Sequence, residues 1–325
     1  MRKYVKFIVG LIISFFLLYL VFRKISINEV IKYIVSANVL YLVLALIFGF
    51  FLLLLRSYRW RLIIKDYKNF KISNFFESTV LGLFFNTILP FRIGDFIQGY
   101  SLARKTNFAK SLTFSSVLME RFVDLFPPII FIITGSFFIV LPKQISIFFS
   151  VLVLLCLILG LILILKFKEL IIKTIDNFSL KLKIFKKIYN VVNNFFLAIE
   201  NFKDISVLIK VGLLTFFLWF GYSFNMWLVC IALDIKLPSV FSGMLVQAIT
   251  SLSVVIPSSP GYIGSWEFMG MLALSVFSVE KTKAVAFSLL SHILGMLPVV
   301  VLGLIFIFKE VKLINSLKEE IKNET

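Results

Sequence analysis

Long uninterrupted apolar runs constrain this chain more than any other feature. Six of them approach the roughly 20 residues that a helix needs to cross a bilayer. Hydrophobic residues make up 60% of the 325-residue chain, against about 45–50% in soluble domains. A backbone in lipid must pair its own polar groups, so each run is expected to be helical. The sequence therefore predicts an all-α polytopic membrane protein with six spans. The runs are 5–22, 39–55, 112–141, 145–165, 207–233 and 284–308.

Two further apolar stretches, 75–103 and 240–279, are each interrupted near the middle by proline, glycine and charged residues. The first interruption reads NTILPFRIGD and begins at Asn86, and the second reads IPSSPGYIGSWE and ends at Glu267. An unpaired backbone group costs several kcal/mol in lipid, so such a break is stable only where it lines a cavity or is covered by protein. We therefore expect two re-entrant helical hairpins, with pairs of full spans as the alternative.

Charge predicts how the chain is oriented. The 34 Lys and Arg residues outnumber the 17 Asp and Glu residues, for a net charge of +17. Most of the basic residues fall in loops on the side of the amino terminus, as the positive-inside rule describes. Arg56 and Arg59, which follow the run 39–55, are counted among these loop residues. We expect a prokaryotic inner-membrane (cell membrane) protein with both termini in the cytoplasm, and the excess charge does not indicate nucleic acid.

The chain divides into a membrane half, 1–165, a linker, 166–206, and a second membrane half, 207–325. The halves share a sparse pattern of residues in the same order. Under the expected topology the two copies point in opposite directions, as in many secondary transporters with a site at the midplane. We expect an inverted repeat, with chance similarity as the alternative. The matched residues are Pro90 with Pro257, Gly94 with Gly264, Asp95 with Ser265, Arg121 with His292 and Pro127 with Pro298.

The linker is the one sizeable segment outside the apolar runs. Its apolar residues recur every three or four positions, and lysines occupy the opposite face, which is typical of an amphipathic helix. We expect a helical pair lying on the cytoplasmic surface of an anionic membrane. Binding of a cytoplasmic partner through 167–206 is the less favoured alternative, and the sequence leaves a homodimer open.

Charged residues within membrane segments are candidates for function, because each costs a few kcal/mol or more at the bilayer centre. Glu120 and Asp124 share one helix face, and Arg121 can pair with Asp124. An internal ion network that only holds helices together is an equally good interpretation. The candidate binding residues of the first half are Asn86, Arg92, Gly94, Asp95, Glu120, Arg121 and Asp124.

In the second half the candidates surround the corresponding break. Asp95 and Ser265 are expected to be N-caps of the helices that leave the two breaks. Such helix N-termini, together with Arg92 and Arg121, suit a phosphate group. His292 is the one histidine of the chain and is expected to be a hydrogen-bonded core residue more often than a ligand. The second-half candidates are Pro257, Gly261, Gly264, Ser265, Glu267 and His292.

Enzyme signatures are absent from the sequence. It contains no HExxH, GxSxG or Walker A motif, and one histidine with two separated cysteines offers few options for metal or nucleophilic chemistry. Cys156 and Cys230 lie in apolar runs and are expected to be core residues. No catalytic residue, metal or cofactor is therefore predicted.

Three ordered motifs resemble those of the lysylphosphatidylglycerol synthase transmembrane-region family, also called flippase-like proteins. They are NTILPxRxGD, ERxxD and PxxPGxxGxxE, and the likeness covers about residues 5–308. The resemblance implies a membrane module that moves a lipid between leaflets, such as a phospholipid, an aminoacylated lipid or a polyprenyl-linked sugar. Full-length synthases of the family add an aminoacyl transferase domain, which is not expected here. The family often has arginine at the position of His292.

The expected function is translocation of an anionic phospholipid or lipid-linked headgroup through a polar cavity at the midplane. Arg92 and Arg121 would hold the phosphate. Four carboxylates, those of Asp95, Glu120, Asp124 and Glu267, would orient the arginines and gate or couple to protons. The alternatives are a membrane enzyme acting on a lipid-linked substrate, with Glu120 or Asp95 as its base, and a scaffold for a separate lipid-modifying synthase.

Overall fold

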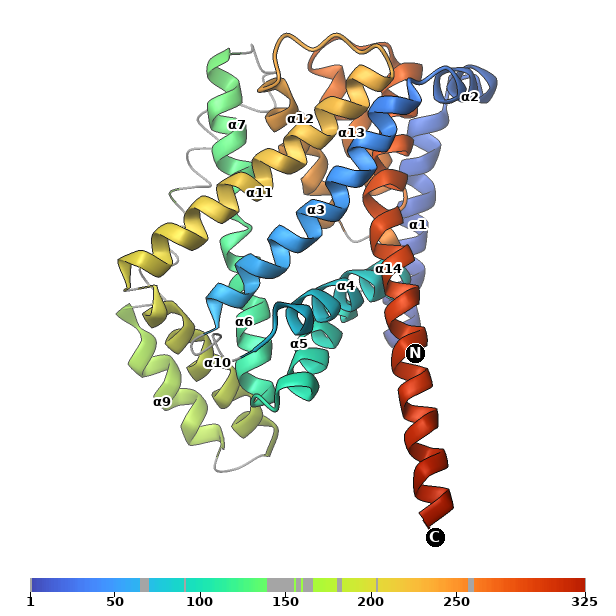
Figure 1. The fold of residues 1–325 in the computed structure, drawn as a ribbon. Helices are drawn as coiled ribbons and strands as arrows, with labels where there is room; N and C mark the ends of the chain where they lie inside the picture. The colour runs from blue at the N-terminus through green and yellow to red at the C-terminus, as the bar shows by residue number, and fades with distance from the viewer. Residues whose placement is uncertain are drawn as a thin grey trace.

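The computed structural model describes residues 2–64, 70–90, 92–138, 155, 159, 166–179, 183–202, 204–256 and 260–324. All regular structure in these residues is helical, which confirms the all-α part of the predicted fold (Figure 1). The helices are α1 (Arg2–Phe22), α2 (Ile27–Val35), α3 (Val39–Ile63), α4 (Ile72–Ile88), α5 (Ile93–Thr106), α6 (Lys110–Val123), α7 (Phe126–Phe138), α9 (Lys168–Ser179), α10 (Lys183–Asn201), α11 (Ile205–Ala232), α12 (Ser242–Ser251), η2 (Leu252–Val254), η3 (Pro260–Tyr262), α13 (Ser265–Ser275) and α14 (Lys281–Glu324).

Three long helices form the frame of the molecule. Among the described residues, Val39–Ile63, Ile205–Ala232 and Lys281–Lys309 are long and apolar enough to cross a membrane. α3 and α11 lie side by side as two tilted rods, and α14 crosses near them (Figure 1). Their outer faces expose large apolar side chains, such as Ile47 of α3 and Phe217 of α11. Such extensive apolar exposure is characteristic of a surface that lipid covers.

The other expected spans are less regular. α1 and α2 together pass as one apolar unit, but they meet at an angle of 81°. In the expected span 112–141, the described residues to Phe138 form two shorter helices, α6 and α7, which separate at Asp124 and Leu125. Pro127 and Pro128 explain this difference, because proline lacks the backbone N–H and clashes with the preceding helical turn. Apart from Leu155 and Leu159, the expected span 145–165 lies outside the described residues.

Each interrupted stretch forms two helices joined at the predicted break. α4 and α5 are joined through Leu89 to Arg92, and α12 and α13 are joined through the short turns η2 and η3. Close packing of α4 on α5 depends on Gly94, since a Cβ there would lie 1.9 Å from the carbonyl oxygen of Gly82. Any other residue at position 94 would force the two helices apart.

The two breaks lie next to each other. Gly261 has a φ of +69°, and a Cβ on it would lie 3.2 Å from the carbonyl oxygen of Thr87, at the end of α4. Gly264, with a φ of +90°, packs against the backbone of Ser14 in α1. The end of α4 and the segment before α13, which are about 170 residues apart in the chain, therefore meet, and the second of them also packs on α1.

The linker forms the expected amphipathic helices, α9 and α10, and α10 packs on α6. Asn194 donates a hydrogen bond from Nδ2 to Oγ of Ser111 at 2.8 Å, and Oγ of Ser115 donates to the carbonyl oxygen of Val191 at 2.8 Å. Phe196 is almost fully buried. The linker is thus attached to the helix that carries Glu120, Arg121 and Asp124.

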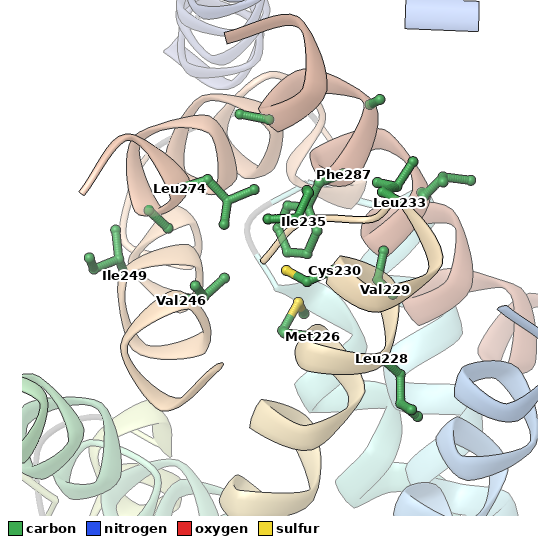
Figure 2. Close-up of a cluster of buried hydrophobic side chains, with 14 of the residues drawn as sticks. Met226, Leu228, Val229, Cys230, Leu233, Ile235, Val246, Ile249, Leu274 and Phe287 are labelled. Carbon is green, nitrogen blue, oxygen red and sulfur yellow. The ribbon is translucent and has the colours of Figure 1, made fainter. Parts of the chain in front are cut away.

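A hydrophobic cluster joins the helices of the second half (Figure 2). Cys230 and Met226 of α11 pack there with Val246 of α12, Leu274 of α13 and Phe287 of α14. Cys230 is a free, buried thiol, as expected of a core residue, whereas Cys156 lies outside the described residues. This cluster fixes α13 against α14, and these two helices carry Glu267 and His292.

Candidate functional site: acid–base pairs at the two breaks

α3 contributes two buried arginines that were expected to lie in a loop after the apolar run 39–55. The helix continues to Ile63, and the spacing of three residues places Arg56 and Arg59 on one face. Arg59 is fully buried and Arg56 is nearly so. The expectation that both are loop residues is therefore wrong, because carboxylates of a neighbouring helix compensate their charges and allow α3 to continue past its apolar run.

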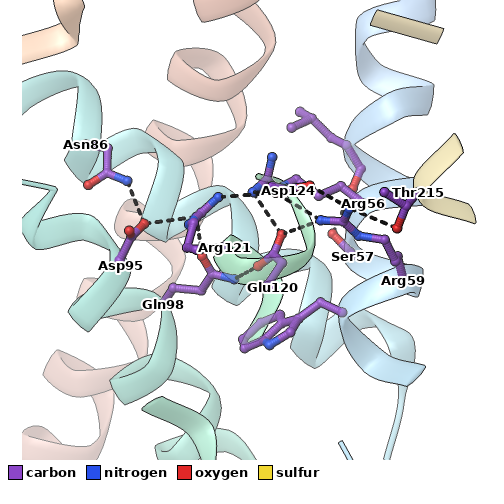
Figure 3. A network of polar contacts seen from close by, with 12 residues as sticks. Arg56, Ser57, Arg59, Asn86, Asp95, Gln98, Glu120, Arg121, Asp124 and Thr215 are labelled. Carbon is purple, nitrogen blue, oxygen red and sulfur yellow. Dashed lines mark hydrogen bonds and ion pairs between the residues drawn. The ribbon is translucent and has the colours of Figure 1, made fainter. Parts of the chain in front are cut away.

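Those carboxylates belong to α6 (Figure 3). Asp124 receives a bidentate contact from Arg59, with Nη1 to Oδ1 at 2.7 Å and Nη2 to Oδ2 at 3.1 Å. Nη2 of Arg56 lies 2.8 Å from Oε1 of Glu120, whose side chain is fully buried. Bidentate, charge-assisted contacts offset the desolvation that makes buried charges costly.

α11 joins this network through uncharged side chains. Trp219 donates from Nε1 to Oδ1 of Asp124 at 3.1 Å, and Arg59 donates from Nη1 to Oγ1 of Thr215 at 3.3 Å. The network therefore fixes α3, α6 and α11 to one another. Glu120 and Asp124 have few oxygen lone pairs left for a substrate.

Gln98 connects this network to α5. Its Nε2 donates to Oε2 of Glu120 at 2.9 Å, and its Oε1 accepts from Nη2 of Arg121 at 3.4 Å. Gln98 is fully buried, so both ends of its amide are used where water is excluded. An amide can bridge an acid and a base in this way because it carries both an acceptor and donors.

Asp95 is the centre of the cluster at the first break (Figure 3). Nη2 of Arg121 donates to Oδ1 of Asp95 at 2.9 Å, and Nδ2 of Asn86 donates to the same oxygen at 2.9 Å. Nε of Arg92 lies 3.6 Å from Oδ2. The expected pairing of Arg121 with Asp124 is looser, at 3.9 Å, so Asp95 is the principal partner of Arg121.

Neither residue expected to be an N-cap occupies that position. The N-cap of α5 is Arg92, with a left-handed backbone at φ 54°, and Asp95 lies within the first turn. The N-cap of α13 is Gly264, and Oγ of Ser265 donates to the carbonyl oxygen of Tyr262 at 3.0 Å. Both expectations are wrong, because α5 already begins at Ile93 and α13 at Ser265. Asp95 and Ser265 are therefore residues within the helices and not their caps. Asp95 still lies where the positive end of the helix dipole favours an anion.

At the second break Glu267 and His292 form a buried pair. Nδ1 of His292 lies 2.6 Å from Oε1 of Glu267, and Nε2 lies 2.8 Å from the carbonyl oxygen of Gly261. The backbone N–H of Gly264 donates to Oε2 of Glu267 at 2.6 Å. The indole of Trp266 stacks on the imidazole with ring centroids 5.3 Å apart. The position and the ring plane of His292 are thus both constrained.

The two clusters are neighbours through the backbone. Asn86, which binds Asp95, precedes Thr87, and the carbonyl of Thr87 lies against Gly261. The carbonyl of Gly261 in turn meets His292. Pro257, also a predicted site residue, lies outside the described residues. Within the described part of the chain, no group of three or more His, Cys, Asp or Glu residues is arranged to hold a metal ion.

The arginines differ in exposure. The side chain of Arg92 is 42% exposed, against 18% for Arg121, 10% for Arg56 and none for Arg59. The four arginines face three carboxylates, those of Asp95, Glu120 and Asp124, so the cluster carries one excess positive charge. Arg92 is thus the arginine of this cluster with most space for an additional anion.

Comparison with known proteins assigns the family. Residues 7–303 match the family described as the lysylphosphatidylglycerol synthase TM region. The chain belongs to this family. The UPF0104 membrane protein MJ1595 of Methanocaldococcus jannaschii is 27% identical, over 93% of this chain and 94% of that protein. The UPF0104 membrane protein MJ1078 of the same organism is 30% identical, over 74% of this chain and 99% of that protein. No solved structure matches the chain.

Membership of the lysylphosphatidylglycerol synthase TM-region family confirms the resemblance carried by the three motifs. Sequence reasoning missed five members of the network, which are Arg56, Arg59, Gln98, Thr215 and Trp219. For the two arginines a signal exists, since their spacing of three places them on one face of a continuing helix. Gln98 and Trp219 are uncharged, so their sequence positions carry no sign of the contacts that they make.

Proposed function

We propose that this family member translocates the anionic headgroup of a lipid across the cell membrane, past the point where the two breaks meet. The observation that carries the proposal is the position of Arg92. It stands at the N-terminus of α5 with a partly exposed guanidinium, while the other arginines of the cluster are held in buried or partly buried ion pairs. A helix N-terminus and a bidentate cation together suit a phosphate.

The proposal includes re-entrant hairpins. At about 1.5 Å per residue, α5 extends about 21 Å and α13 about 17 Å, and both lengths are short of a hydrocarbon core of about 30 Å. Helices of this length favour hairpins that enter and leave on one side, with the breaks near the midplane. Both termini would then lie in the cytoplasm, as the distribution of basic residues indicates.

Matching acid–base pairs support an inverted repeat within the same proposal. In each half the first turn of the second hairpin helix is joined to the next helix, by Asp95 and Arg121 in one half and by Glu267 and His292 in the other. The partners are 26 and 25 residues apart. Two halves with one contact plan would form a site at their interface.

Within this proposal the charged residues have different roles. Arg92 and Arg121 bind the headgroup, and Asp95 holds both arginines until the anion arrives. Glu120 and Asp124 keep α3, α6 and α11 together through Arg56 and Arg59. The geometry gives less support to an enzyme, because arginine side chains occupy the carboxylates of both candidate bases, Asp95 and Glu120.

Reconstituted vesicles test the proposal. Fluorescent anionic and zwitterionic lipids are placed in both leaflets, and dithionite added outside bleaches whatever reaches the outer leaflet. We expect faster bleaching of the anionic lipid with the wild-type protein, and a loss of at least tenfold in rate for Arg92→Ala and Arg121→Ala, equivalent to about 1.4 kcal/mol. Arg104→Ala is the matched control, since Arg104 is an exposed arginine at the other end of α5. Unchanged rates in folded Arg92→Ala and Arg121→Ala proteins would refute the mechanism.

A further inference from the structure

The contacts of the Glu267–His292 pair at the second break require one more hydrogen than a neutral imidazole and a carboxylate supply. Both ring nitrogens of His292 face oxygen atoms at hydrogen-bond distance, 2.6 Å to the Glu267 carboxyl group and 2.8 Å to the Gly261 carbonyl. A backbone carbonyl only accepts hydrogen bonds, so Nε2 must carry a hydrogen. A neutral imidazole has one N–H, which leaves Nδ1 as a bare lone pair facing the carboxyl oxygen.

One additional proton resolves this conflict. It can reside on Nδ1, giving an imidazolium beside a carboxylate, or on Oε1, giving a neutral imidazole beside a carboxylic acid. In both cases the contact of Nδ1 with Oε1 is a hydrogen bond and the pair as a whole is neutral. We propose that Glu267 and His292 form a binding site for one proton, and that this proton holds the second break against α14.

Loss of the proton has a defined structural consequence. With Glu267 ionised and His292 neutral, the single N–H satisfies either the carboxylate or the carbonyl of Gly261. The other contact then places two lone pairs face to face at under 3 Å, which is repulsive in a site that excludes water. The carboxylate accepts the stronger, charge-assisted hydrogen bond. Deprotonation therefore releases Gly261, and with it the segment that touches Thr87.

The surroundings isolate this pair from other ionisable groups. Among the described contacts of His292, Glu267 is the titratable partner, and η3 brings the phenol of the neighbouring Tyr262. α1 and α4 reach this region through Ser14 and Thr87. The other acids and bases of the packed helices lie elsewhere along them. They are Arg2, Lys3 and Lys6 at the start of α1, Glu29 and Lys32 on α2, Arg56, Arg59 and Arg61 on α3, Glu77 on α4, and Glu280, Lys281 and Lys283 at the start of α14, with further charges from Lys309 onward.

The first half differs in this respect. Its corresponding pair is Arg121 with Asp95, and a guanidinium does not lose its proton at physiological pH. The two breaks are thus held by analogous contacts, of which only the second can be released by raising the pH within the physiological range. This asymmetry does not depend on which lipid moves, or on whether any lipid does.

The single histidine makes the proposal directly measurable. Protein labelled with ¹⁵N-histidine and placed in lipid nanodiscs reports on His292 alone. We expect one proton to leave the pair when the pH is raised from about 5 to about 10, a range that brackets ordinary histidine titration. Distances between spin labels at Ile88 and Ile263, exposed residues beside the two breaks, should lengthen or broaden over the same pH interval. Both native cysteines are replaced for this labelling.

Two variants determine whether the pair is responsible. In Glu267→Gln the amide can donate to Nδ1 and still accept from Gly264, so all contacts persist without a titratable proton, and the label distance should not change with pH. His292→Arg should remove the pH dependence in the same way. A ring titration that is identical in wild type and Glu267→Gln, or a label distance equal at both pH extremes in wild type, would overturn the proposal. Neither measurement involves lipid transport, so this proposal can fail while the proposed function stands.

Discussion

The carbonyl oxygen of Thr87 lies so close to Gly261 that a Cβ at that glycine would sit 3.2 Å from it. This contact joins the break of the first hairpin to the break of the second. On one side it continues through Asn86 to Asp95, and on the other through the Gly261 carbonyl to His292. The charged residues of both halves are therefore joined by one continuous chain of contacts.

Substitution of Gly261 tests the importance of this contact. Gly261→Ala should destabilise the protein by roughly 1–2 kcal/mol, because a side chain is disfavoured at positive φ and would press on Thr87. Thermal unfolding in detergent measures the change. Gly212→Ala on α11 is the control, since a Cβ there meets nothing within 4 Å, and alanine favours a helix over glycine. Equal stability of the two variants would contradict the contact.

The buried pair of Arg59 and Asp124 should behave as a coupled unit. Arg59→Met alone removes the bidentate partner of Asp124 and leaves it the longer contacts of Arg56 and Arg121, at 3.5 and 3.9 Å. We expect a loss of about 3 kcal/mol, the lower end of the cost of breaking a buried pair. Asp124→Leu should have a similar effect, whereas the double variant should lose clearly less than the sum of the two. A double-mutant cycle of unfolding free energies provides the measurement, and additive losses would show that the two residues do not interact.

The protein should lose stability when either end of the Gln98 amide is removed. Gln98→Leu leaves Oε2 of Glu120 buried without its donor, which is expected to cost about 1–3 kcal/mol. Gln98→Glu should be more harmful, because it places a second carboxyl group beside Glu120 at a fully buried position. Ranking the midpoints of chemical unfolding tests this order, and a Gln98→Glu protein as stable as wild type would contradict it.

Local signals in the sequence located the two breaks and many of the charged residues around them. Proline, glycine and charge are conspicuous in an apolar chain, so Asn86 to Asp95 and Gly261 to Glu267 could be identified without a structure. The end of α3 could not, because it depends on Asp124 and Glu120 from another helix. The helix break before Pro127 was predictable in principle, since consecutive prolines mark a helix start and not a helix interior.

Pairing within the site was harder to predict than its composition. Arg121 could reach Asp124 on its own helix, and that local pairing was expected. In the structure the guanidinium of Arg121 lies 2.9 Å from the carboxylate of Asp95 and 3.9 Å from that of Asp124. The difference arises because the close packing of α5 on α4 at Gly94 fixes where Asp95 lies. The spacing of residues in the sequence does not predict how closely α5 packs on α4.

The most direct test of the central claim is a change of headgroup selectivity at Arg92. Bleaching rates are compared for anionic, zwitterionic and cationic fluorescent lipids in vesicles that carry wild type, Arg92→Glu or the control Arg104→Glu. We expect wild type and Arg104→Glu to favour the anionic lipid, and we expect this preference to fall by at least tenfold in Arg92→Glu, or about 1.4 kcal/mol. Equal rates for all three lipids in wild type, or an unchanged preference in Arg92→Glu, would contradict it.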